Sequence, residues 1–97
     1  MPTSRAVVPT ASASRYLQQL CKHWSHRFDV TFDPQHGAVP FGEGRAAEFF
    51  ADENALTAEV ATPDETSLRQ MQDVVADHLK RFAFREELAF DWQPVER

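Results

Sequence analysis

The spacing of apolar residues changes twice along this chain, and these changes limit the fold more than any other feature of the sequence. Segments with the helical repeat of about 3.6 residues stand near both ends of the chain. Between them the repeat falls to two, as in Phe28-Asp29-Val30-Thr31-Phe32-Asp33, which is typical of a strand with one buried face. The sequence therefore predicts a sheet packed against two helices.

Turn-forming residues divide the region of two-residue repeat into four short strands. The turns are expected at 34–37, which reads Pro-Gln-His-Gly, at 42–44 and at 52–54. Two more strands are expected near the ends of the chain, and Pro94 ends the last one. The complete set of predicted strands is 5–9, 28–33, 38–41, 45–51, 55–61 and 86–93.

Two amphipathic helices complete the pattern. The first is expected from Ala11 to about Arg27, with Thr10 or Ser12 as its N-cap. The second is expected to begin with a capping box in which Thr62 is the N-cap, and to end at about Phe84. The predicted buried stripes are Ala13, Leu17, Leu20, Cys21 and Trp24 on the first helix, and Leu68, Met71, Val75, Leu79 and Phe82 on the second.

The element order β-α-β-β-β-β-α-β predicts an α+β fold. An antiparallel sheet with one apolar face needs a cover, and two amphipathic helices supply it. We expect a two-layer sandwich of a mostly antiparallel sheet with two antiparallel helices on one face. The 97 residues form a single domain, with a core from about residue 5 to residue 93.

Charge and composition narrow the function classes. The formal net charge is −5; residues 1–27 carry four bases and no acid, whereas residues 28–97 carry 15 acids and 6 bases. An acidic total argues against nucleic-acid binding, which needs a basic surface. We expect a cytoplasmic protein with no membrane partner, because the sequence has no long apolar run, no apparent secretion signal and only one cysteine.

Two long segments carry a family resemblance. Residues 14–24 (SRYLQQLCKHW) and 77–88 (DHLKRFAFREEL), followed by Trp92, resemble the bacterial family known as domain of unknown function 2218. The resemblance extends from Arg5 to about Trp92; it implies a small stand-alone bacterial protein and transfers no catalytic residue. The stretch 45–50 is more apolar than the family's middle strand, so the register of that strand stays open.

Common catalytic motifs are absent from the sequence. The turn at 42–44 does not have the glycine spacing of a phosphate-binding loop, and there is no nucleophile elbow. Cys21 falls in the apolar stripe of the first helix, where a buried and unreactive thiol is expected. The alternative is a nucleophile with His23 or His78 as its base.

Metal binding is a weak alternative. His23 and His26 are three residues apart on the first helix, close enough to share an ion. Two ligands are too few for a structural zinc site. A third would have to come from His36 or His78, which the sequence cannot place.

Basic and histidine side chains gather on one side of each helix. Because the helices are expected to be antiparallel, these sides either both face the space between the helices or both face away from it. If they face it, they form a basic groove suited to a carboxylate or phosphate ligand. The residues concerned are Tyr16, His23 and Arg27 on the first helix and His78, Arg81 and Arg85 on the second.

The other face of the sheet is expected to be polar and exposed to solvent. An alternative is a surface for a basic partner or a second subunit, and exposed edge strands also favour a homodimer. The residues expected on this face are Asp29, Thr31, Asp33, Thr57, Glu59 and Asp91.

Three functional hypotheses follow from these observations. The first is a non-catalytic binding or interaction module for a small anion or a protein partner. The second is an accessory protein for a metal, a haem or an iron chelate, based on the histidines and their arginine neighbours. The third is a small enzyme with His78, Glu86 or Glu87 as general acid or base. The sequence leaves the ligand and any cofactor unassigned.

Overall fold

A computed structural model describes residues 2–95, and this part of the chain contains eight regular elements in the predicted order. They are β1 (Thr3–Pro9), α1 (Ala13–Trp24), β2 (Thr31–Phe32), β3 (His36–Gly42), β4 (Arg45–Ala51), β5 (Ala55–Ala61), α2 (Glu65–Phe82) and β6 (Gln93–Pro94).

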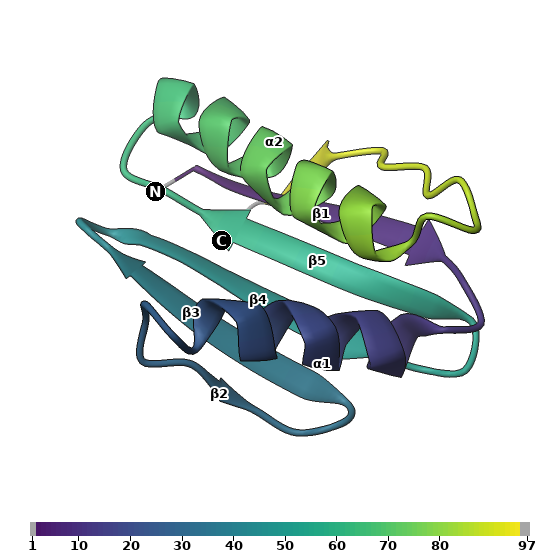
Figure 1. The fold of residues 1–97 in the computed structure, drawn as a ribbon. Coiled ribbons are helices and arrows are strands. Elements are labelled where there is room, and N and C mark those ends of the chain that lie inside the picture. The colour runs from purple at the N-terminus through teal and green to yellow at the C-terminus, as the bar shows by residue number, and fades with distance from the viewer. Residues whose placement is uncertain (1, 96–97) are drawn as a thin grey trace.

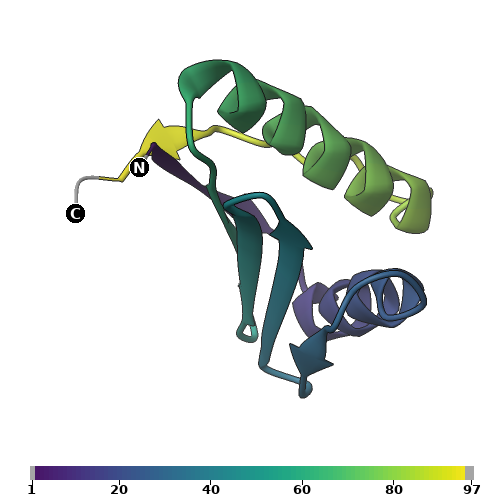
Figure 2. The same cartoon turned by 90° about the vertical axis from the view of Figure 1, so that its left-hand side faces the viewer.

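All strands join one antiparallel sheet with the order β2-β3-β4-β5-β1-β6. Both helices cover the same face of this sheet, and in the described part of the chain the other face carries no helix (Figure 2). The two helices run in opposite directions, with α1 over the β3–β4 side and α2 over the β1–β5 side (Figure 1). The predicted α+β fold is therefore confirmed.

The core lies between the sheet and the two helices. Strands β1, β4 and β5 turn alternate residues toward the helices, among them Val8, Phe49 and Leu56, which are fully buried. The predicted stripes of both helices are buried as well, except for Phe82, which is half-buried at their edge. In β4, Ala47 and Phe49 point inward while Phe50 is exposed, which answers the open question of its register.

Two predicted strands are much shorter than expected. The strand predicted at 28–33 is reduced to β2, because Phe28 N–H still bonds the Trp24 carbonyl and the chain turns before it pairs. The strand predicted at 86–93 is reduced to β6, which begins only at Gln93 and ends with Pro94. In both segments alternate apolar side chains reach the core, although most of the backbone pairs with no strand.

The helix boundaries also differ from the prediction. The capping box was wrong: α2 begins at Glu65, and its N-cap is Asp64, whose carboxylate accepts a 2.7 Å hydrogen bond from Ser67 N–H. Thr62 is fully buried, its N–H bonds the Pro2 carbonyl, and its hydroxyl donates to the Asp64 carbonyl. Thr62 is therefore held in the connection between β5 and α2, and the N-cap lies two residues later than predicted.

The first helix is shorter than predicted at both ends. It begins at Ala13 and ends at Trp24. Ser12 occupies the N-cap position but makes no capping hydrogen bond with its side chain; its N–H is bound by the Thr10 hydroxyl instead.

The expected polar sheet face forms only in part, and the register places Thr31 on it, in line with Ala38 and Glu48. Thr57 and Glu59 do lie on the face of β5 that points away from the helices, but Glu59 is only 8% exposed. Asp29 and Asp33 lie in connections beside the short β2, and Asp91 lies in the irregular segment before β6. These residues are thus spread over the surface and do not form an acidic patch.

Candidate functional site

The C-terminal end of α1 contacts the second half of α2. The ring centroids of His23 and His78 are 5.4 Å apart, and those of Trp24 and His78 are 5.1 Å apart. His23 also contacts Phe82, with a centroid distance of 6.1 Å. These two histidines therefore lie together between the helices.

A cavity of about 290 Å³, here called the interhelical pocket, adjoins this histidine pair. It is built by both helices, the connection after α1, and the facing ends of β3 and β4. Its lining residues are His23, Trp24, Arg27, Phe28, Phe41, Arg45, Met71, Val74 and His78.

Aromatic rings form one side of the interhelical pocket. Phe41 packs edge-on against Trp24 at a centroid distance of 4.9 Å and against Phe28 at 5.0 Å. Trp24 is almost completely buried, whereas Phe28 and Phe41 are half-buried. This cluster gives the pocket a firm apolar wall, because each ring is held by its neighbour.

His78 is oriented by its own helix. Its Nδ1 lies 2.7 Å from the Val74 carbonyl oxygen, one turn earlier in α2. A carbonyl only accepts, so the proton of the neutral ring lies on Nδ1 and Nε2 remains as the acceptor. The bond fixes the ring plane and presents one defined nitrogen to a ligand.

Arg45, the first residue of β4, was not predicted as a site residue. Its Nε is buried and has no hydrogen-bond partner within residues 2–95. Its Nη2 lies 3.5 Å from a carboxylate oxygen of Glu43, a side chain that is 86% exposed and therefore contributes little. The Arg45 side chain as a whole is 34% exposed, and Nε is its buried donor. A buried donor without a partner is energetically unfavourable unless a ligand or water accepts its hydrogen bond.

A signal for Arg45 was present in the alternation of β4. Arg45, Ala47 and Phe49 are two residues apart, so they share the face that points to the helices. The sequence did not reveal that this end of β4 lies beneath the histidine pair.

Three of the six predicted groove residues line the interhelical pocket, namely His23, Arg27 and His78. Arg81 is exposed on the surface of α2 and does not line the pocket. Arg85 lies beyond the end of α2, where helical spacing no longer applies, and its guanidinium sits 5.4 Å from the Phe84 ring centroid.

Tyr16, the remaining predicted groove residue, is a buried structural contact at the other end of the helix pair. Its hydroxyl donates to the Glu86 carboxylate, which also accepts a 3.2 Å hydrogen bond from the Thr10 hydroxyl. The hydrogen bond to Glu86 raises the pKa of Tyr16, and burial of the ring adds to this effect. Tyr16 thereby ties the chain after α2 to α1.

The alternative chemistries find less support in the geometry. Cys21 is fully buried, and burial raises the pKa of its thiol to about 11, which opposes the role of a nucleophile. His26 is exposed, and residues 2–95 contain no cluster of three or more histidine, cysteine or acidic side chains placed to hold a metal ion.

A larger open depression of about 1030 Å³ lies on the outer side of α1. It includes Arg15, Gln18, Lys22 and Phe32, the last 40% exposed. Within the described part of the chain, none of the polar side chains that line it is both buried and unpaired. The smaller interhelical pocket is therefore the stronger candidate.

Comparison with known proteins now adds to this geometry. The model of a family described as an uncharacterized protein conserved in bacteria (DUF2218) matches residues 5–93. The chain belongs to this family. A solved structure, the NMR structure of PA4090 from Pseudomonas aeruginosa, is 44% identical, covers the whole of both chains and superposes with a TM-score of 0.83.

The family assignment confirms the resemblance inferred from the sequence. No curated protein matches the chain. The family membership therefore assigns no chemistry to the interhelical pocket. Within residues 2–95, neither helix is long and apolar enough to cross a membrane.

Proposed function

We propose that this DUF2218 protein is a non-catalytic binding module whose interhelical pocket takes a small organic anion. The observation that carries the proposal is the buried, unpartnered Nε of Arg45 at a pocket whose lining contains no acid. Arg27 adds a second guanidinium to the lining, and the imidazoles of His23 and His78 add polar ring atoms. A carboxylate would satisfy the guanidinium donors, which match its planar geometry.

The aromatic wall indicates the rest of the ligand. A flat apolar ring can pack on Trp24, Phe28 and Phe41 while its charged group reaches the arginines. The volume of about 290 Å³ is at the lower end for small-molecule sites, so the ligand is small. An aromatic monocarboxylate meets these conditions better than free phosphate, which would leave the apolar wall unused.

Benzoate is a suitable probe, and Trp24 can report its binding. The chain has two tryptophans, so a Trp92→Phe background leaves Trp24 as the only indole. Benzoate should change the Trp24 fluorescence saturably and raise the thermal midpoint by mass action. Inorganic phosphate should bind more weakly.

Arginine variants test the site directly. Arg45→Gln should weaken benzoate binding about tenfold or more, because a hydrogen bond to a charged group contributes ~1.5–3 kcal/mol. Arg81→Gln is the matched control, since Arg81 is exposed outside the pocket, and it should bind as the wild type does. Equal losses in both variants, or no loss in Arg45→Gln, would contradict the proposal.

A second candidate is a metal-bearing anion such as a haem or an iron chelate. It is favoured by the His23–His78 pair, whose imidazoles could take two positions on a metal that brings its other ligands along. This candidate predicts that ferric citrate binds more tightly than citrate and that His78→Gln abolishes the difference. If iron makes no difference, the simple organic anion is the better description.

A further inference from the structure

The open face of the sheet lies away from the helices and the pocket, and no other element of residues 2–95 covers it. The residues of β1, β3, β4 and β5 that point outward on this face are unusually apolar for a solvated surface. Val7 is 55% exposed and Phe50 is 40% exposed, while Ala46 and Ala61 add small apolar side chains. Large exposed apolar side chains on an uncovered sheet face often mark an interface.

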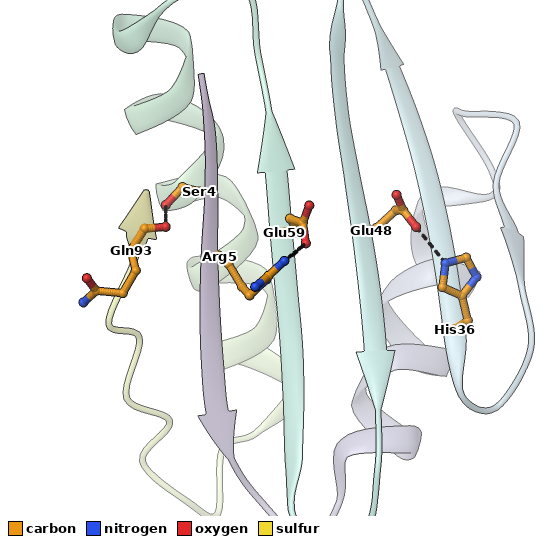
Figure 3. A network of polar contacts seen from close by, with 6 residues as sticks. All are labelled: Ser4, Arg5, His36, Glu48, Glu59 and Gln93. Carbon is orange, nitrogen blue, oxygen red and sulfur yellow. Dashed lines mark hydrogen bonds and ion pairs between the residues drawn. The ribbon is translucent and has the colours of Figure 1, made fainter. Parts of the chain in front are cut away.

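Charged side chains form an ordered row across the same face (Figure 3). The strand register places Arg5 beside Glu59 and Glu59 beside Glu48. Arg5 Nη2 lies 3.1 Å from Glu59 Oε2, and His36 Nε2 lies 2.8 Å from Glu48 Oε2. The two neighbouring carboxylates thus turn apart, each toward a partner on an outer strand.

The row is arranged so that it can complement a second copy of itself. A two-fold axis along β5 would exchange the β1 side of one copy with the β4 side of the other. Arg5 of each copy would then face Glu48 of the second copy, because both lie in register with Glu59 on β5. The half-exposed Arg5 and Glu48 would gain opposite charges.

The same operation matches the apolar residues. Val7 and Phe50 are both in register with Thr57 on β5, so Val7 of each copy would lie over Phe50 of the second copy. Small residues on β5, Ala55 and Ala61, allow the sheets to approach to the usual spacing of about 10 Å. One axis therefore pairs Arg5 with Glu48 and Val7 with Phe50. Glu59 lies on the axis, but it is only 8% exposed and its carboxylate is held by Arg5 of its own copy.

We propose that the open sheet face is a homodimer interface in which a second copy packs face to face about a two-fold axis along β5. The three seven-residue strands that overlap about this axis, β1, β5 and β4, at ~4.8 Å spacing and ~3.4 Å per residue, offer a plane of roughly 340 Å² per copy. This is below the ~800 Å² per partner of a standard interface, so the dimer is reversible.

Sedimentation equilibrium of the full chain tests the dimer. Between about 1 μM and about 1 mM, the range of weak reversible association, the average mass should rise from monomer toward dimer. Val7→Lys, a change at an exposed position, should keep the protein monomeric while its circular dichroism stays native. A monomer at every concentration of wild type, or an unchanged dimer in Val7→Lys, would overturn the proposal.

Charge reversal tests the orientation of the two copies. Arg5→Glu would place two carboxylates against each other at both symmetric contacts, and Glu48→Arg would place two guanidinium groups there. Each variant alone should therefore be monomeric. Mixed together, the two variants should form a heterodimer. One contact then pairs the two substituted side chains, which carry opposite charges. The other contact keeps the native Arg5 against the native Glu48.

Arg81→Glu is the control for a charge reversal outside the interface, and it should dimerise as the wild type does. If the Arg5→Glu and Glu48→Arg variants fail to associate when mixed, although both are folded, the two-fold arrangement along β5 is wrong. If Arg81→Glu is also monomeric, the association depends on net charge and not on this face.

Discussion

At the scale of single residues, a glycine of the sheet leaves room for a side chain of α1. A Cβ built on Gly37 in β3 would lie 2.5 Å from Cys21 Sγ in α1, which is far too close. Gly37→Ala should therefore lower the free energy of unfolding by about 1–3 kcal/mol through overpacking.

A double variant separates this clash from other effects of the substitution. Cys21→Ala removes the sulfur that a Cβ at position 37 would meet, so Gly37→Ala should cost much less in that background. Urea denaturation of the four proteins measures the coupling. A penalty that is the same with and without the sulfur would show that the strain lies in the β3 backbone instead.

Tyr16 gives a second prediction at this scale, because it is the only tyrosine in the chain. Its folded pKa is raised by the hydrogen bond to Glu86 and by burial. The resulting stabilisation is complete below the ordinary phenol pKa of about 10 and is lost as pH rises through the raised value. An ultraviolet titration of phenolate formation should show a midpoint above that of the unfolded chain.

The Glu86→Gln variant identifies the cause. It removes the negative charge that favours the protonated phenol while keeping a hydrogen-bond acceptor of similar shape, so the Tyr16 midpoint should move back toward its ordinary value. If the midpoint does not move, the charge of Glu86 has no part in it, and burial and the retained hydrogen bond set the pKa of Tyr16.

At the scale of elements, the N-cap of α2 determines where the second helix begins. The hydrogen bonds from the N-terminal turn of α2 lower the pKa of Asp64. Its stabilising effect is therefore present above the ordinary carboxyl pKa and is lost as pH falls through the lowered folded value. Acid should destabilise the wild type more than Asp64→Asn, which keeps a capping oxygen but carries no titrating charge.

The control for this prediction is Thr62→Ser, which keeps the hydroxyl that donates to the Asp64 carbonyl. Its stability should follow the same acid profile as the wild type, because Asp64 still titrates. Parallel acid unfolding of Asp64→Asn and wild type would contradict the assignment of Asp64 as the charged cap.

The elements also show where sequence periodicity succeeds and where it fails. The buried stripes of both helices and the strands β4 and β5 were predicted, because their side-chain spacing and their backbone pairing agree. The segment around Leu88 alternates like a strand and packs against the core, yet β1 pairs with the last segment only at Ser4 and Arg5. Alternation reports which side chains are buried, but it does not show whether the backbone has a pairing partner.

At the scale of the whole molecule, the order of the strands decides which candidate residues meet. The sequence predicted adjacent strands for the middle of the chain, but not the insertion of β1 between β5 and β6. Helical spacing therefore found His23, Arg27 and His78, whereas Arg45 required knowledge of which strand ends lie beneath the helices. Periodicity also does not show whether the basic sides of the two helices face each other or face away, because this depends on how the helices are placed on the sheet.

The two proposed surfaces lie on opposite faces of one sheet, and this leads to the last prediction. In β4 the side chain of Arg45 belongs to the helix side and that of Glu48, three residues later, to the open side. Neither surface needs the other to move, so ligand binding and dimerisation should be energetically independent.

Benzoate should bind the monomeric Val7→Lys variant and the wild-type dimer with the same Kd, and Arg45→Gln should dimerise normally. Because coupling between sites is reciprocal, a change of about fivefold or more in either experiment must appear in both. Such a change would mean that the sheet transmits strain between its two faces.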